Sequence, residues 1–148
     1  MFERIVAAID SDPERSAKVV DAATGLARAF HSEVVVAHVR EVERPSAMVA
    51  AAGRPGALPP SLHIESEEDA TALVDDAIGR LRSAGVAANG RIGPGAGSTA
   101  RELLEIAQAH NSNLIIVGDR DSRVTDVLLG GVAHKIAHLA DCPVLLVR

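Results

Sequence analysis

The sequence predicts an α/β fold in which helices cover both faces of a parallel sheet. Runs of aliphatic and β-branched residues alternate with segments of helical periodicity, an order typical of repeated β-α-β units. The first run, Ile5–Ile9, is apolar throughout, which indicates a strand that is buried on both faces. The chain has 148 residues, the length of one domain. We therefore expect a single domain over residues 1–148.

The first part of the chain contains two predicted strands and one helix. The first strand covers residues 4–10. Asp12 and Pro13 then have the positions of a helix N-cap and of a first-turn proline. Apolar residues keep helical spacing as far as Phe30. A second β-rich run, Glu33–Val39, follows.

The segment Glu41–Ile64 interrupts this alternation. It contains four prolines and two glycines and shows no sustained period. Segments of this length inside a compact domain are usually functional or disordered. Its composition favours disorder or a mobile flap over a lid with a defined ligand role.

The second part of the chain predicts three helices and three strands. Ser66 and the acidic residues after it suit a helix start, and Gly85 suits the end of the same helix. Gly93–Gly97 could be a phosphate loop before a helix, but a connecting turn is the stronger interpretation because no lysine follows. The remaining predicted elements are strands at Val86–Ile92, Asn113–Val117 and Val144–Val147 and helices at Ser98–His110 and Val132–Ala140.

Composition excludes several classes of function. The net charge is −5, and the only aromatic residues are Phe2 and Phe30, so neither phosphate-backbone binding nor base stacking is expected. No apolar run approaches the roughly 20 residues of a membrane span. The single cysteine, Cys142, suits a reducing compartment and a structural role. We expect a cytoplasmic protein without nucleic-acid or membrane partners.

The stretch from Asn113 to Arg148 contains the most informative motif. A buried-strand run is followed by a charged loop, two glycines and a helix, a layout that α/β proteins use to hold phosphates on backbone amides. If the first strand lies beside the fourth, their carboxyl ends at Asp10 and Gly118 frame a ligand crevice. His134 and His138 have a metal-compatible spacing, but no third ligand is evident, and a surface pair is the stronger interpretation.

Four segments together resemble the universal stress protein family in order and spacing. They are Ile5–Asp10, Gly97–Leu103, Asn113–Gly118 and Gly130–Val147. The resemblance implies a Rossmann-like sheet, similar to that of adenine nucleotide alpha-hydrolases, with strand order 3-2-1-4-5. It also implies a homodimer that is built by pairing the last strands.

The resemblance further implies an adenine-nucleotide site. Many family members bind ATP through the pattern G-x2-G-x9-G-[S/T]. Asp10 matches an acceptor for the adenine amino group, although a turn-capping role is equally compatible. The expected cofactor-binding residues include the loop residue Arg120. They are Ala8, Asp10, Val39, Val117, Gly118, Arg120, Asp121, Gly130, Gly131 and Val132. For Ala8, a core role is the simpler interpretation.

The glycine pattern is degraded at three points. Asp121 stands at the second glycine, the following spacing is one residue short, and Gly131 replaces the hydroxyl residue. The lost hydrogen bond weakens phosphate binding by about 1.5–3 kcal/mol, and Asp121 adds repulsion of roughly 1–3 kcal/mol. Arg120 and Arg123 offset part of this by pairing with phosphate. Mg²⁺ on Asp119 or Asp121 is another route.

We therefore predict a stress-response regulatory protein without tight ATP binding. It would act through an unidentified protein partner, without a cofactor and without catalysis. The alternative is a member that binds ATP, AMP or a cyclic nucleotide, for which a single phosphate group suffers least from Asp121. A weak Mg²⁺-dependent nucleotide hydrolase is the third hypothesis.

Overall fold

A computed structural model describes residues 1–43, 63–119 and 131–148. Five parallel strands form one sheet. In spatial order the strands are β5 (Ala87–Gly93), β2 (Glu33–Val39), β1 (Arg4–Ala8), β6 (Leu114–Gly118) and β7 (Val144–Val147). Counted along the chain, this is the predicted order 3-2-1-4-5. The order reverses between β1 and β6, which pair in parallel from Ile5↔Leu114 to Ala8↔Val117. The predicted α/β fold is confirmed.

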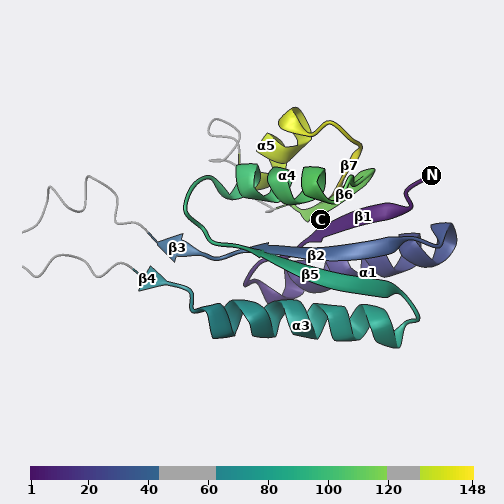
Figure 1. The fold of residues 1–148 in the computed structure, drawn as a ribbon, viewed down its shortest axis with the longest axis horizontal. Helices are drawn as coiled ribbons and strands as arrows, with labels where there is room; N and C mark the ends of the chain where they lie inside the picture. The colour runs from purple at the N-terminus through teal and green to yellow at the C-terminus, as the bar shows by residue number, and fades with distance from the viewer. Residues whose placement is uncertain (44–62, 120–130) are drawn as a thin grey trace, which may run out of the picture.

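Two pairs of helices cover the two faces of the sheet (Figure 1). Helices α1 (Pro13–Phe30) and α3 (Glu67–Ser83) pack on one face. Helices α4 (Thr99–Ala109) and α5 (Val132–Leu139) pack on the other. Alternate residues of β1, β2 and β6 therefore enter two separate hydrophobic clusters, as expected for strands that are buried on both sides.

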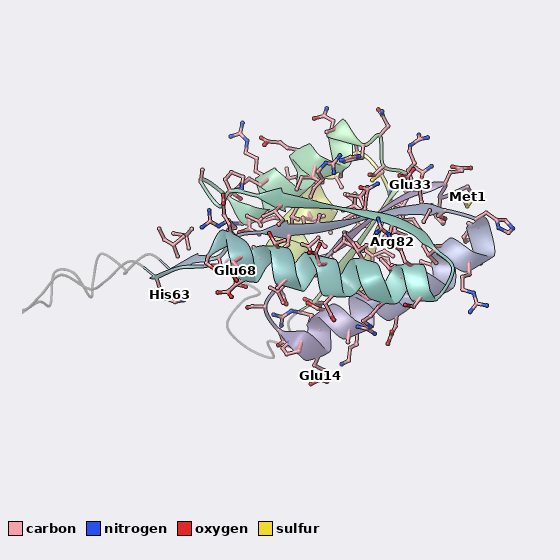
Figure 2. All side chains as sticks on the ribbon, turned by 60° about the horizontal axis from the view of Figure 1, so that its bottom comes forward. Met1, Glu14, Glu33, His63, Glu68 and Arg82 are labelled. Atoms are coloured by element: carbon pink, nitrogen blue, oxygen red, sulfur yellow. The ribbon has the colours of Figure 1, made fainter. Side chains whose placement is uncertain are left out.

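Polar side chains occupy the outer surfaces of the helices. Glu14, at the start of α1, and Glu68, at the start of α3, are exposed and point away from the sheet (Figure 2). Carboxylates in the first turn also interact favourably with the positive end of the helix dipole.

The predicted helix ends are formed as the sequence indicates. The Asp12 carboxylate accepts a hydrogen bond from the Arg15 amide at 3.0 Å, and the Ser66 hydroxyl accepts one from the Asp69 amide at 3.0 Å. Gly85 follows α3 with a φ of +80°, a left-handed conformation that favours glycine after a helix.

The ends of the irregular segment form a short antiparallel hairpin that we did not predict. Strand β3 (Val42–Glu43) pairs with β4 (His63–Ile64). Two-residue strands are too short to show a period of two, so their sequence carries no recognisable pattern. The Arg40 guanidinium stabilises the base of this hairpin by donating two hydrogen bonds, at 2.9 and 2.7 Å, to the Glu65 carbonyl. The rest of the segment lies outside the described residues.

Two smaller points concern the limits of the elements. The first strand ends at Ala8, two residues before the predicted end. Within the described ranges, no helix is long and apolar enough to cross a membrane.

Candidate functional site

A cavity opens at the carboxyl ends of the central strands, where the order of the sheet reverses. Its volume is about 360 Å³, at the lower end of the roughly 300–1,000 Å³ typical of small-molecule sites. Strands β1, β2 and β6 and the first turns of α1, α4 and α5 contribute to its walls. The lining residues are Ala8, Ile9, Asp10, Arg15, His38, Val39, Glu41, Thr99, Leu103, Val117, Gly118, Asp119, Gly131, Val132, Ala133 and His134.

The Asp10 carboxylate is held by groups from its own loop and from helix α1. Its Oδ1 accepts a hydrogen bond from the Asp12 amide at 2.9 Å, which is the geometry of an Asx turn. Its Oδ2 accepts a hydrogen bond from Arg15 Nε at 2.6 Å. The Ser16 hydroxyl donates to the Asp10 carbonyl at 2.7 Å and ties the loop to the helix. Asp10 therefore lines the cavity and organises the turn, and its role toward an adenine amino group stays a prediction.

Arg15 crosses the end of strand β6. A Cβ atom added at Gly118 would lie 2.3 Å from Arg15 Cγ and 2.7 Å from Cδ, so only glycine leaves space for this side chain. The Arg15 side chain is 18% exposed, and its Nη1 lies 3.4 Å from Asp12 Oδ2. A guanidinium held against two carboxylates thus forms one wall of the cavity.

Helix α5 begins directly at the cavity. Gly131 is its N-cap and supplies no side-chain hydrogen bond. Within the described part of the chain, no hydrogen bond is formed by the amides of the first turn, Val132 to His134. All of these residues line the cavity. The N–H groups and the positive end of the helix dipole make such a position suitable for an anion.

The Asp119 carboxylate lies near this helix start and is engaged by two basic side chains. Its Oδ2 lies 3.4 Å from Arg148 Nε and its Oδ1 lies 3.9 Å from His134 Nε2. Asp119 is largely buried, and its amide donates to the Val147 carbonyl at 2.8 Å. The contact with Arg148 partly offsets the negative charge that Asp119 brings to the anion-binding end of the cavity.

His38 links the floor of the cavity to the segment that precedes α3. The ring is 1% exposed. Its Nδ1 lies 3.0 Å from the Ile9 carbonyl, which can only accept, so Nδ1 is the donor. Its Nε2 lies 2.8 Å from Glu65 Oε2, which also accepts the Glu41 amide at 2.9 Å. One proton must therefore lie between Nε2 and the carboxylate, and the pair positions the ends of β1 and β2.

The structure brings together seven of the ten predicted site residues. Five come from the strand ends and two from the start of α5, and all line the cavity: Ala8, Asp10, Val39, Val117, Gly118, Gly131 and Val132. Ala8 and Val39 are also buried in the core. Arg120, Asp121 and Gly130 lie outside the described residues, as does Arg123.

The cavity wall also contains nine residues that were not among the expected cofactor-binding residues: Ile9, Arg15, His38, Glu41, Thr99, Leu103, Asp119, Ala133 and His134. A usable signal existed for some of them. The first turn of a helix that follows a parallel strand lies at the carboxyl edge of the sheet, which places Arg15 and Thr99 at this edge. The last residues of β2 reach the same edge, which places His38 there.

The glycine loop before α4 is a connecting turn whose amides bind a carboxylate of the same chain. The Gly95 and Gly97 amides donate to the two oxygens of Glu102, at 3.0 and 3.3 Å. Gly95 has a φ of +75°, and a Cβ there would lie 2.3 Å from the Arg40 carbonyl oxygen. The loop thus uses its anion-binding geometry internally.

The remaining candidates of the sequence are the His134 and His138 pair and Cys142. The described ranges contain no group of three or more His, Cys, Asp or Glu residues that could hold a metal ion. Burial, and to a smaller extent the charge of Asp141, raises the pKa of the Cys142 thiol. A raised pKa disfavours the reactive thiolate, in agreement with a structural role.

Comparison with known proteins decides the family. The model of the Universal stress protein family matches residues 1–148. The chain belongs to the universal stress protein family. It is 32% identical to universal stress protein YxiE of Bacillus subtilis over the full length of both chains. It is 31% identical to universal stress protein A homolog 1 of Coxiella burnetii, with 99% of this chain and 96% of the other aligned.

Solved universal stress proteins have the same fold. One, solved in complex with cAMP, superposes with a TM-score of 0.71 at 21% identity and covers 99% of this chain and 97% of its own. Another, from Archaeoglobus fulgidus in complex with dAMP, gives a TM-score of 0.67 at 18% identity, with 100% and 98% covered. At these identities the comparison concerns the fold alone.

Proposed function

We propose that this universal stress protein binds a purine nucleotide with a single phosphate group, and that it acts as a regulator and not as an enzyme. The observation that carries the proposal is the start of α5 at the cavity, which has no side-chain cap among the described residues. An anion placed there would accept hydrogen bonds from amides that have no acceptor among the described residues.

The two ligands of related structures support this choice. cAMP and dAMP each carry one phosphate group, and both were bound by proteins of this fold. A base of similar size would lie between the apolar residues Ala8, Val39 and Val117, which line the cavity at the strand ends. The phosphate would then face the amides of Val132 and Ala133.

The Asp119 carboxylate and the residue found at the second glycine of the ATP-binding pattern favour one phosphate over three. Asp119 lines the cavity, and Asp121 stands at a glycine position of the ATP-binding pattern. Each carboxylate near a triphosphate costs roughly 1–3 kcal/mol at intermediate dielectric. We therefore propose that AMP binds more tightly than ATP, and that the loss of tight ATP binding expected from the sequence reflects a changed ligand.

Removal of one backbone amide tests the phosphate position. Val132 is the first residue of α5, a position where proline is well tolerated, and Gly131 already has the extended ψ of 170° that suits a residue before proline. Val132→Pro should keep the helix and weaken AMP binding about 10- to 150-fold, the value of one charge-assisted hydrogen bond. Isothermal titration calorimetry measures this change.

The matched control is Glu67→Pro at the first position of α3. Ser66 before it has a ψ of 155°, and this helix start does not line the cavity. The control should bind AMP with unchanged affinity. Equal affinity of the Val132→Pro variant and the wild type would place the phosphate elsewhere, and a wild-type protein that binds no purine mononucleotide would refute the proposed function.

A further inference from the structure

The carboxylates of the cavity already have hydrogen-bond or ion-pair partners, whereas some of its N–H donors remain available. Three carboxylates line it, and each has a partner: Asp10 binds Arg15, Glu41 accepts the Ser11 hydroxyl at 2.7 Å, and Asp119 contacts Arg148. The acceptors of the cavity are therefore largely satisfied by the protein. Donors remain available at the start of α5 and on the guanidinium of Arg15.

We infer that Arg15 determines base selectivity in this cavity, by covering the Asp10 carboxylate and presenting donors in its place. A free carboxylate would select a base with an amino group, because it can only accept hydrogen bonds. A guanidinium instead selects acceptors, as arginine does on the O6 and N7 edge of guanine. The inference rests on the proposed function and adds the class of base: a 6-oxopurine is preferred over a 6-aminopurine.

The geometry gives Arg15 little freedom to leave Asp10. The Nε–Oδ2 distance of 2.6 Å is that of a strong charge-assisted hydrogen bond. The aliphatic part of the side chain lies over Gly118, so the side chain is held at its stem as well as at Nε. A guanidinium has five N–H groups, and the bond to Asp10 uses only the one on Nε. Nη1 also lies 3.4 Å from Asp12 Oδ2, so Nη2 is the terminal nitrogen that we assign to an acceptor on the ligand.

The matched ligands AMP and IMP test this inference, because they differ at position 6 of the purine and share ribose and phosphate. Calorimetric titration of the wild-type protein should show IMP binding at least about 5-fold more tightly than AMP, the lower limit for one well-placed arginine contact. Arg15→Met should reverse the preference, because Asp10 is then free to accept from the amino group.

Two further variants make the test specific. Lys18→Met on the same helix removes an exposed cation that pairs with Glu14 and should leave the AMP-to-IMP ratio unchanged. Arg15→Lys keeps a positive charge beside Asp10 but lacks the planar fork. It should fold even where Arg15→Met does not, and the preference for IMP should disappear.

The outcomes separate the inference from the proposed function. A ratio that Arg15→Met and Arg15→Lys leave unchanged, or a wild-type preference for AMP, would overturn the role of Arg15 while nucleotide binding stands. A purely structural ion pair would lower the melting temperature in these variants without altering the ratio. A wild-type protein that binds neither ligand would overturn both.

Discussion

At the scale of single residues, the Arg15 side chain links the two strand ends that frame the cavity. It binds Asp10 after β1 and packs on Gly118 at the end of β6. The side chain of Arg15 needs the space that a Cβ at position 118 would occupy. Gly118 therefore has a packing role in addition to its place in the glycine pattern.

A double-mutant cycle measures this contact. Gly118→Ala should lower the free energy of unfolding by about 1–3 kcal/mol, the usual cost of overpacking, because the methyl group displaces Arg15 from Asp10. In an Arg15→Ala background the same substitution should cost much less. Gly97→Ala, where a Cβ meets nothing within 4 Å, is the control and should change stability by under about 0.5 kcal/mol. Equal costs of Gly118→Ala in both backgrounds would contradict the assignment.

The His38–Glu65 pair should contribute to stability more than a surface pair does. Glu65→Ala leaves a buried ring nitrogen without its partner, at a cost of about 1–3 kcal/mol, and this cost is measurable by urea denaturation. The control is Glu67→Ala, whose exposed carboxylate lies 3.9 Å from Arg40 Nη1 and should contribute at most about 1 kcal/mol. If both variants unfold at the same urea concentration as the wild type, the pair is not formed.

Sequence reasoning predicted the position of residues that end a strand. Asp10 and Gly118 were expected at one edge because the carboxyl ends of parallel strands meet there, whereas Gly131 was named from the glycine pattern of the family. The partner that each side chain selects was not predictable. Nothing local indicates that Arg15 reaches across to Asp10, or that Glu102 turns back to the loop before α4.

At the scale of secondary-structure elements, the helix ends were the most predictable feature. Capping by Asp12 and Ser66 depends on neighbouring residues only, so the local sequence contains the information. The hairpin of β3 and β4 was missed because it depends on Arg40 and Glu65, which lie far apart in sequence. Long-range contacts of this kind leave no period in the sequence.

Two glycines near the end of α3 offer a matched test of element stability. Gly79 lies within the helix, and a Cβ there meets nothing within 4 Å. Gly79→Ala should therefore stabilise the protein by about 0.5–1 kcal/mol. Gly85→Ala should destabilise it by roughly 1 kcal/mol, because φ is +80° there. In thermal unfolding, the melting temperature should rise for Gly79→Ala and fall for Gly85→Ala. A lower melting temperature of Gly79→Ala would show that this helix position is constrained.

At the scale of the whole molecule, strand β7 leaves one edge of the sheet open within the described residues. It pairs with β6 on one side, and Leu145 is 38% exposed. An exposed apolar edge strand is a natural template for pairing with a second chain. On this geometry we propose a homodimer through the last strand, as the sequence resemblance implies.

Multi-angle light scattering tests the dimer. At micromolar concentration the mass should be twice the 15.4 kDa of one chain. The mass should not change with salt, because the edge of β7 is apolar, whereas an ion-paired interface would weaken with ionic strength. A monomer mass under these conditions would contradict the proposal.

The central claim is that the cavity holds a purine nucleotide with one phosphate group, and the most direct test is the nucleotide content of the protein. The purified protein is denatured, and the released small molecules are separated by ion exchange and identified by mass. The expected result is a purine mononucleotide that approaches one per chain, or, if it washes away during purification, saturable binding of AMP or IMP on titration. No released nucleotide and no saturable binding at millimolar concentrations would contradict the claim.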